Sequence, residues 1–95
     1  MHFLVQIDTS LPADMPLSVR DALLQREFDR GTVLRSDGVI KAIWRVPGRL
    51  ANVGIWNAPD ADTLDTAITS LPAWPWMSVT VTPLAVHPLS STPMG

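Results

Sequence analysis

The chain has 95 residues, of which 46% are hydrophobic and 17% charged, and its formal net charge is −2. This length suits a single domain, residues 1–95, and the absence of any run of like charges argues against nucleic-acid binding. No apolar stretch approaches the roughly 18 residues of a membrane span, and no export signal opens the sequence. The lack of cysteine excludes disulfides and thiolate metal sites and is compatible with the cytoplasm.

The same composition argues against a metal site and favours self-association. The two histidines, His2 and His87, stand at opposite ends of the chain, so metal-ligand spacing is absent. A domain this short buries only about 60 to 65% of its unfolded surface. Four tryptophans and the high apolar content exceed what one small core easily hides, so we expect a homo-oligomer.

The first part of the chain is predicted to form a strand and then one long helix. Residues 2–8 alternate apolar and polar side chains, which is the period of a half-buried strand. Pro12 and Pro16 cannot extend a strand ladder, and Pro16 suits the opening of a helix. The helix is expected over residues 15–36 and should end before Gly38, which readily adopts the left-handed cap conformation.

The middle of the chain is predicted to form a β-hairpin. Residues 39–46 and 50–56 both alternate, and Pro47-Gly48 between them is typical of a turn. Strict alternation assigns to the core Ile40, Ala42, Trp44 and Val46 from the first strand, and Ala51, Val53 and Ile55 from the second. The open face of the sheet then carries Lys41, Ile43, Arg45, Asn52, Gly54 and Trp56. Such a face suits a small-molecule pocket or a subunit contact.

The last part of the chain completes an α+β domain. A short helix is expected over residues 60–71 and a strand over residues 77–82, followed by a Pro-rich, extended tail from about residue 83. The order β-α-β-β-α-β is that of the ferredoxin-like sandwich. Its four-stranded antiparallel sheet carries two helices on one face.

Glu27, the only glutamate of the chain, lies in the middle of the long predicted helix. At about 100° per residue, Leu23 and Leu34 project within roughly 40° of it. A carboxylate on that apolar stripe faces inward or into a cleft, where desolvation raises its pKa and suits it to proton transfer. The alternative is a partly exposed Glu27 that pairs with Arg26 or Arg30 on the same helix face.

Several separated motifs carry a resemblance that is collinear over nearly the whole chain. They are Asp8 to Pro16 (DTSLPADMP), Arg26-Glu27, Ile43-Trp44-Arg45, Gly48-Arg49 followed by Ala51-Asn52, Ser70-Leu71-Pro72 with Pro75, and Val81 to Leu84 with His87-Pro88. In these motifs the sequence resembles the muconolactone Δ-isomerase family. The resemblance implies a ferredoxin-like enzyme of the β-ketoadipate pathway that uses no cofactor and assembles from dimers into a decamer.

The reaction implied by this resemblance is a 1,3-proton shift in an unsaturated γ-lactone. Muconolactone loses its ring C4 proton to form a dienolate, which is reprotonated at C2 to give 3-oxoadipate enol-lactone. The acid/base glutamate of the family matches Glu27. The substrate carboxylate and the dienolate oxygen both need donors, for which Arg45, Lys41 and Asn52 are the candidates.

Alternatives remain for these binding residues. Arg45 could instead form a structural or intersubunit ion pair, and Asn52 could satisfy a backbone group. His87 is a candidate to complete the pocket of a neighbouring subunit, and a packing or surface role is its alternative.

The sequence departs from the family pattern at several polar or basic positions. Apolar residues or glycine stand where the pattern has lysine (Leu24), Lys-Trp (Val39-Ile40), tyrosine (Leu50 and Trp76) and serine (Gly54). These departures predict a preference for a more apolar, alkyl- or halogen-substituted lactone. Two other functions stay open, namely a chloromuconolactone dehalogenase of similar fold and a non-catalytic, oligomeric ligand-binding module.

Overall fold

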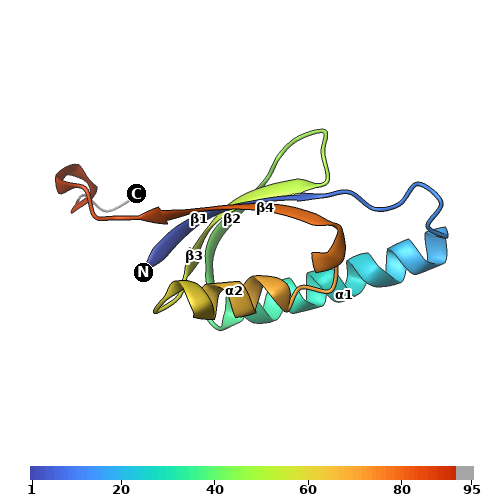
Figure 1. Cartoon of the computed structure of the whole chain (residues 1–95), viewed down its shortest axis with the longest axis horizontal. Helices are drawn as coiled ribbons and strands as arrows, with labels where there is room; N and C mark the ends of the chain where they lie inside the picture. The colour runs from blue at the N-terminus through green and yellow to red at the C-terminus, as the bar shows by residue number, and fades with distance from the viewer. Residues whose placement is uncertain (92–95) are drawn as a thin grey trace.

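The chain forms a four-stranded antiparallel sheet with two helices on one face, as predicted (Figure 1). The computed structural model describes residues 1–91. The strands are β1 (His2–Thr9), β2 (Ile40–Arg45), β3 (Ala51–Asn57) and β4 (Met77–Leu84), and the helices are α1 (Leu17–Ser36) and α2 (Ala61–Thr69). The strands lie side by side in the order β2-β3-β1-β4. Within residues 1–91, no helix is both long and apolar enough to cross a membrane.

Local chemistry favours both ends of α1 and the start of α2. Pro16, with φ −56°, precedes the first turn of α1. Gly38 adopts φ +77° after its last turn, and the Gly38 and Val39 amides donate to the carbonyls of Arg35 and Leu34 at 3.2 and 2.9 Å. These two hydrogen bonds form a Schellman cap, which confirms the predicted helix end. The side chain of Asp60 caps α2 by accepting from the Thr63 amide at 2.7 Å.

The end of the chain is more structured than expected. β4 continues two residues beyond its predicted end, to Leu84, and a short 3-10 turn follows over Pro88–Ser91. The remaining residues of the predicted tail, 92–95, lie outside the described residues.

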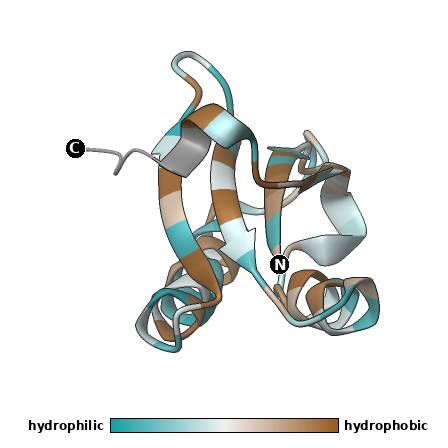
Figure 2. Cartoon of the chain, turned by 90° about the vertical axis from the view of Figure 1, so that its left-hand side faces the viewer, coloured by the Kyte–Doolittle hydropathy of each residue, from teal (hydrophilic) through white to brown (hydrophobic). Residues whose placement is uncertain are grey.

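The hydrophobic core lies between the sheet and the two helices. Its largest fully buried side chains are Trp56, Phe3 and Val5 from the two central strands. Leu34 of α1 and Leu64 of α2 pack against them. Figure 2 shows both helices on the same side of the sheet, with apolar segments along the strands. The opposite face of the sheet has no covering element within residues 1–91.

The prediction of which β3 side chains point toward the helices is wrong. Its register with β1 pairs Phe3 with Trp56, Val5 with Gly54, and Ile7 with Asn52. Directly paired residues of antiparallel strands project to the same face, and these β1 residues are buried beneath the helices. Asn52, Gly54 and Trp56 therefore face the helices, while Val53 and Ile55 face the open side.

A β-bulge in β2 explains the corresponding error on that strand. Ile40 pairs with Trp56, but the register shifts between Ile40 and Ala42, so that Ile43 pairs with Gly54 and Arg45 with Asn52. An extra residue in one strand reverses the alternation beyond it. Ile43 and Arg45 therefore turn toward the helices, like Ile40. Gly54 permits this close approach, because a Cβ there would lie 2.6 Å from the Ala42 carbonyl oxygen.

Candidate active site

A cavity of about 580 Å³ lies between α1 and the helix-facing side of the sheet. Its lining is mainly apolar and includes Leu24 and Ile43, with Glu27 projecting from the helix. Arg45 and Asn52 belong to the opposite wall, on neighbouring strands. The prediction of a pocket on the open face of the sheet is therefore wrong. The bulge in β2 and the register of β3 bring the side chains of Arg45 and Asn52 to the same side of the sheet as Glu27.

Glu27 is held in place by the backbone that follows α2. Its Oε2 accepts a hydrogen bond from the fully buried Ala73 amide at 2.8 Å. Burial raises the pKa of the Glu27 carboxyl and outweighs the opposite effect of this hydrogen bond. No other described residue bonds to the carboxylate, so Oε1 is available to a molecule in the cavity.

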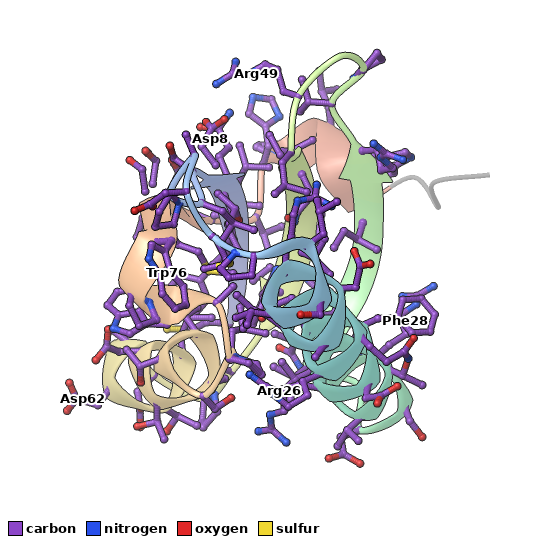
Figure 3. The ribbon with its side chains drawn as sticks, turned by 90° about the vertical axis from the view of Figure 1, so that its right-hand side faces the viewer. Asp8, Arg26, Phe28, Arg49, Asp62 and Trp76 are labelled. Carbon is purple, nitrogen blue, oxygen red and sulfur yellow. The ribbon has the colours of Figure 1, made fainter. Side chains whose placement is uncertain are left out.

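The alternative of an ion pair on the helix face is wrong for Glu27. Arg30 Nε donates instead to Ser70 Oγ at 2.9 Å. Arg26 extends from α1 on the side away from the sheet (Figure 3). Within residues 1–91, the ion pairs join Arg20 to Asp21 and Arg49 to Asp8. The carboxylate of Glu27 is therefore not neutralised by any cation of the described residues.

Arg45 is the cavity cation with no partner in the described chain. Three arginines line the cavity. Arg35 donates to the carbonyls of Ile40 and Lys41, and Arg49 pairs with Asp8 near the hairpin, as Figure 3 shows. The side chain of Arg45 forms no hydrogen bond or ion pair with residues 1–91, so its guanidinium can bind an anion. Within residues 1–91 Arg45 therefore forms no structural ion pair, whereas an ion pair between subunits is not tested.

Two buried polar atoms of the cavity lining have no hydrogen-bond partner in residues 1–91. They are Asn52 Oδ1 and Trp56 Nε1. Most buried polar groups are paired, and an unpaired one costs about 1 to 3 kcal/mol. Asn52 therefore does not satisfy a backbone group, and its side-chain oxygen is buried without a partner.

The other two predicted binding residues do not line this cavity. The Lys41 ammonium lies near Gly38, about 3.6 Å from where a Cβ of that residue would stand. His87 follows β4, and its Nδ1 accepts from the Leu89 amide at 3.0 Å. A contribution of His87 to a neighbouring subunit stays a prediction.

Sequence reasoning missed one group of this site and placed another on the wrong face of the sheet. The Ala73 amide carries no side-chain signal, because it meets Glu27 only where the fold brings the segment after α2 beside α1. Trp56 was assigned to the open face by simple alternation. Its pairing with Phe3 of β1 is what turns the indole toward the helices. Only a correct strand register could have found it.

Comparisons with known proteins identify the family of the chain. Residues 1–90 match the family model described as muconolactone delta-isomerase. The muconolactone delta-isomerase of Cupriavidus pinatubonensis is 39% identical over 90 residues, covering 95% of this chain and 98% of the relative. Muconolactone delta-isomerase 1 of Acinetobacter lwoffii is 37% identical, covering 95% and 94%.

A solved structure gives the same result at the level of the fold. A crystal structure of muconolactone isomerase superposes with a TM-score of 0.87 at 30% identity, covering 93% of this chain and 92% of the other. The chain therefore belongs to the muconolactone delta-isomerase family.

Proposed function

We propose that the protein catalyses a 1,3-proton shift in muconolactone or a substituted muconolactone, giving the corresponding 3-oxoadipate enol-lactone. One observation carries the proposal: Glu27 stands in an apolar cavity with one oxygen fixed by the Ala73 amide and the other available. The names of the related proteins support the substrate class. The reaction changes no oxidation state, so the proton transfer itself needs no redox cofactor.

The geometry suits one carboxylate that performs both proton transfers. Glu27 Oε1 removes the C4 proton, and the electrons of the C–H bond move into the ring to form the dienolate. The protonated Glu27 then returns the proton to C2 of the same small ring. The raised pKa of Glu27 favours this double role, because a group whose pKa is closer to the working pH takes up and releases protons efficiently.

The substrate carboxylate is assigned to the wall opposite α1. The Arg45 side chain forms no hydrogen bond or ion pair within residues 1–91, and Asn52 is its cross-strand neighbour. A guanidinium with an adjacent amide suits a carboxylate that must be anchored away from the reacting carbons.

The apolar part of the lining favours a substituted lactone. Three positions that depart from the family pattern, Leu24, Ile40 and Leu50, line the cavity, whereas Val39 and Trp76 do not. Apolar side chains there provide contact surface for an alkyl or halogen substituent and no hydrogen bond for a polar one. We therefore propose higher kcat/KM for methyl- or chloro-substituted lactones than for muconolactone.

One assay separates this proposal from its alternatives. Purified protein is given muconolactone, methylmuconolactone and 5-chloromuconolactone in parallel, and absorbance and chloride release are followed. Isomerisation without chloride supports the proposal, and stoichiometric chloride release supports a dehalogenase. Saturable lactone binding with no turnover of any substrate would indicate a ligand-binding module and would overturn the proposed activity.

We also propose that the protein works in the cytoplasm, which its lack of cysteine allows. Fractionation of cells that express the full chain tests this placement.

A further inference from the structure

Gly31 lies inside the long helix α1, four residues after Glu27, where its backbone does not require glycine. Among the described glycines, Gly38 and Gly48 have a positive φ, whereas Gly31 does not. Glycine destabilises a helix interior relative to alanine, so its presence in the middle of α1 calls for another physical reason.

Close packing against another element does not require this glycine either. Apart from its two chain neighbours and the backbone of its own helix, no atom of residues 1–91 lies within 4 Å of where a Cβ of Gly31 would stand. At Gly54, by contrast, a Cβ would lie 2.6 Å from the Ala42 carbonyl oxygen. Gly31 therefore leaves open space, whereas Gly54 permits a close approach.

The space beside Gly31 belongs to the cavity that holds Glu27. Gly31 lines this cavity, as do Leu24 and Phe28 of the same helix. At about 100° per residue, position 31 projects between Glu27 and Phe28, roughly 40° from the first and 60° from the second. Side chains four residues apart on a helix have their Cβ atoms about 5 to 6 Å apart. The cavity therefore extends beside the Glu27 side chain at the one position of this helix face that carries no side chain.

We propose that the space beside Gly31 is a specificity subsite for a methyl- or chlorine-sized group on C3 of the lactone ring. This inference rests on the proposed function, in which Glu27 serves both C4 and C2. C3 lies between these two carbons, so it must lie close to the carboxylate. With no atom within 4 Å of the Cβ position, the space admits one carbon-sized group at van der Waals contact. A side chain at position 31 would occupy this space in place of the substituent.

The kinetic test fills the space step by step. Wild type, Gly31→Ala and Gly31→Val are each given muconolactone and 3-methylmuconolactone, and the ratio of kcat/KM for the methylated lactone to that for muconolactone is compared. One methylene in an apolar pocket is worth about 10- to 200-fold in kcat/KM, so this ratio should fall by about tenfold or more in Gly31→Val and by less in Gly31→Ala. Alanine and valine both have a higher helix propensity than glycine, so the fold of α1 is retained.

Ala22→Val is the matched control for the step from alanine to valine. Ala22 lies on the same helix, is exposed and does not line the cavity. This substitution should leave the ratio of the two kcat/KM values at its wild-type level. A folded Gly31→Val protein that also keeps the wild-type ratio contradicts the subsite and leaves the isomerase activity standing.

A binding measurement separates the subsite from the proposed activity. Saturated γ-lactones with the acetate side chain, with and without a methyl group on C3, cannot isomerise, and calorimetry gives the Kd of each. Gly31→Val should weaken the binding of the methylated ligand about tenfold more than that of the unsubstituted ligand. An equal effect on both ligands, or no binding of either ligand to the wild type, overturns the subsite whether or not the protein isomerises muconolactone.

Discussion

At the scale of single residues, the site depends on the carboxylate of Glu27, whose surroundings disfavour its charged form. Glu27 receives one backbone hydrogen bond, from Ala73, and no cation of the described chain pairs with it. Burial therefore dominates and raises the pKa of its carboxyl. Arg45, on the opposite wall, is left available for the substrate instead of neutralising the base.

The raised pKa of Glu27 predicts a pH dependence of activity. Glu27 must be deprotonated to act as a base, so kcat/KM should fall as the pH falls through its raised pKa. The midpoint of the acid limb of the kcat/KM profile should lie above 4.5, the ordinary pKa of a glutamate side chain. A kcat/KM profile for a substrate that binds weakly measures the value in the free enzyme. A midpoint at or below 4.5 would show that burial does not control this group.

The same shift predicts a pH-dependent difference in stability. Because the pKa of Glu27 is raised by folding, its stabilising contribution is complete below the ordinary pKa and is lost as pH rises through the raised value. The Glu27→Gln amide does not ionise and can still accept from Ala73. Relative to wild type, the variant should therefore gain free energy of unfolding between acid and neutral pH, as measured by urea denaturation.

At the scale of strands and helices, the sequence predicted every main element but not the facing of the hairpin. Alternation and capping residues are local signals, so they located all four strands and the end of α1 at Gly38. The bulge near Ala42 has no comparable signal, because it depends on Gly54 of the partner strand allowing a close approach. Glu27 was found from its helical spacing, whereas Ala73 was not, since its contact depends on long-range packing.

The bulge predicts that replacing two glycines by alanine has opposite effects on the free energy of unfolding. Gly54→Ala places a Cβ 2.6 Å from the Ala42 carbonyl oxygen, so the strands must shift, at a cost of about 1 to 3 kcal/mol. Gly31→Ala meets nothing within 4 Å on α1 and should add about 0.5 to 1 kcal/mol through helix propensity. Denaturant unfolding of both variants measures these changes. Equal stability of the two proteins would show that Gly54 is not required for the hairpin register.

At the scale of the whole molecule, apolar side chains remain outside the core. Phe28 of α1, which lines the cavity, is 71% exposed, while Val86 and Leu89 beyond β4 are 90% and 80% exposed. One face of the sheet is also uncovered within residues 1–91. These features support our proposal of a closed homo-oligomer, with a decamer built from dimers as the expected form, in which the segment after β4 docks on a neighbour.

Light scattering tests this assembly. The full chain should behave as an oligomer, and Val86→Asp should shift it toward smaller species because a charge would enter an apolar contact. Val86→Thr, which keeps the shape without the charge, is the control. Removing residues 89–95 should be milder than removing residues 83–95, because Pro83 and Leu84 still pair with β1. A stable monomer at micromolar concentration would reject the assembly.

The most direct test of the account compares wild type, Glu27→Gln and Arg26→Gln on the lactone that the wild type isomerises fastest. Loss of a general acid/base costs about 10²- to 10⁴-fold, so Glu27→Gln should lose at least that order in kcat while keeping its fold and its lactone binding. Arg26→Gln removes a neighbouring charge that points away from the sheet and should retain wild-type turnover. A folded Glu27→Gln protein with near-wild-type kcat would contradict the assignment of Glu27 as the group that moves the proton.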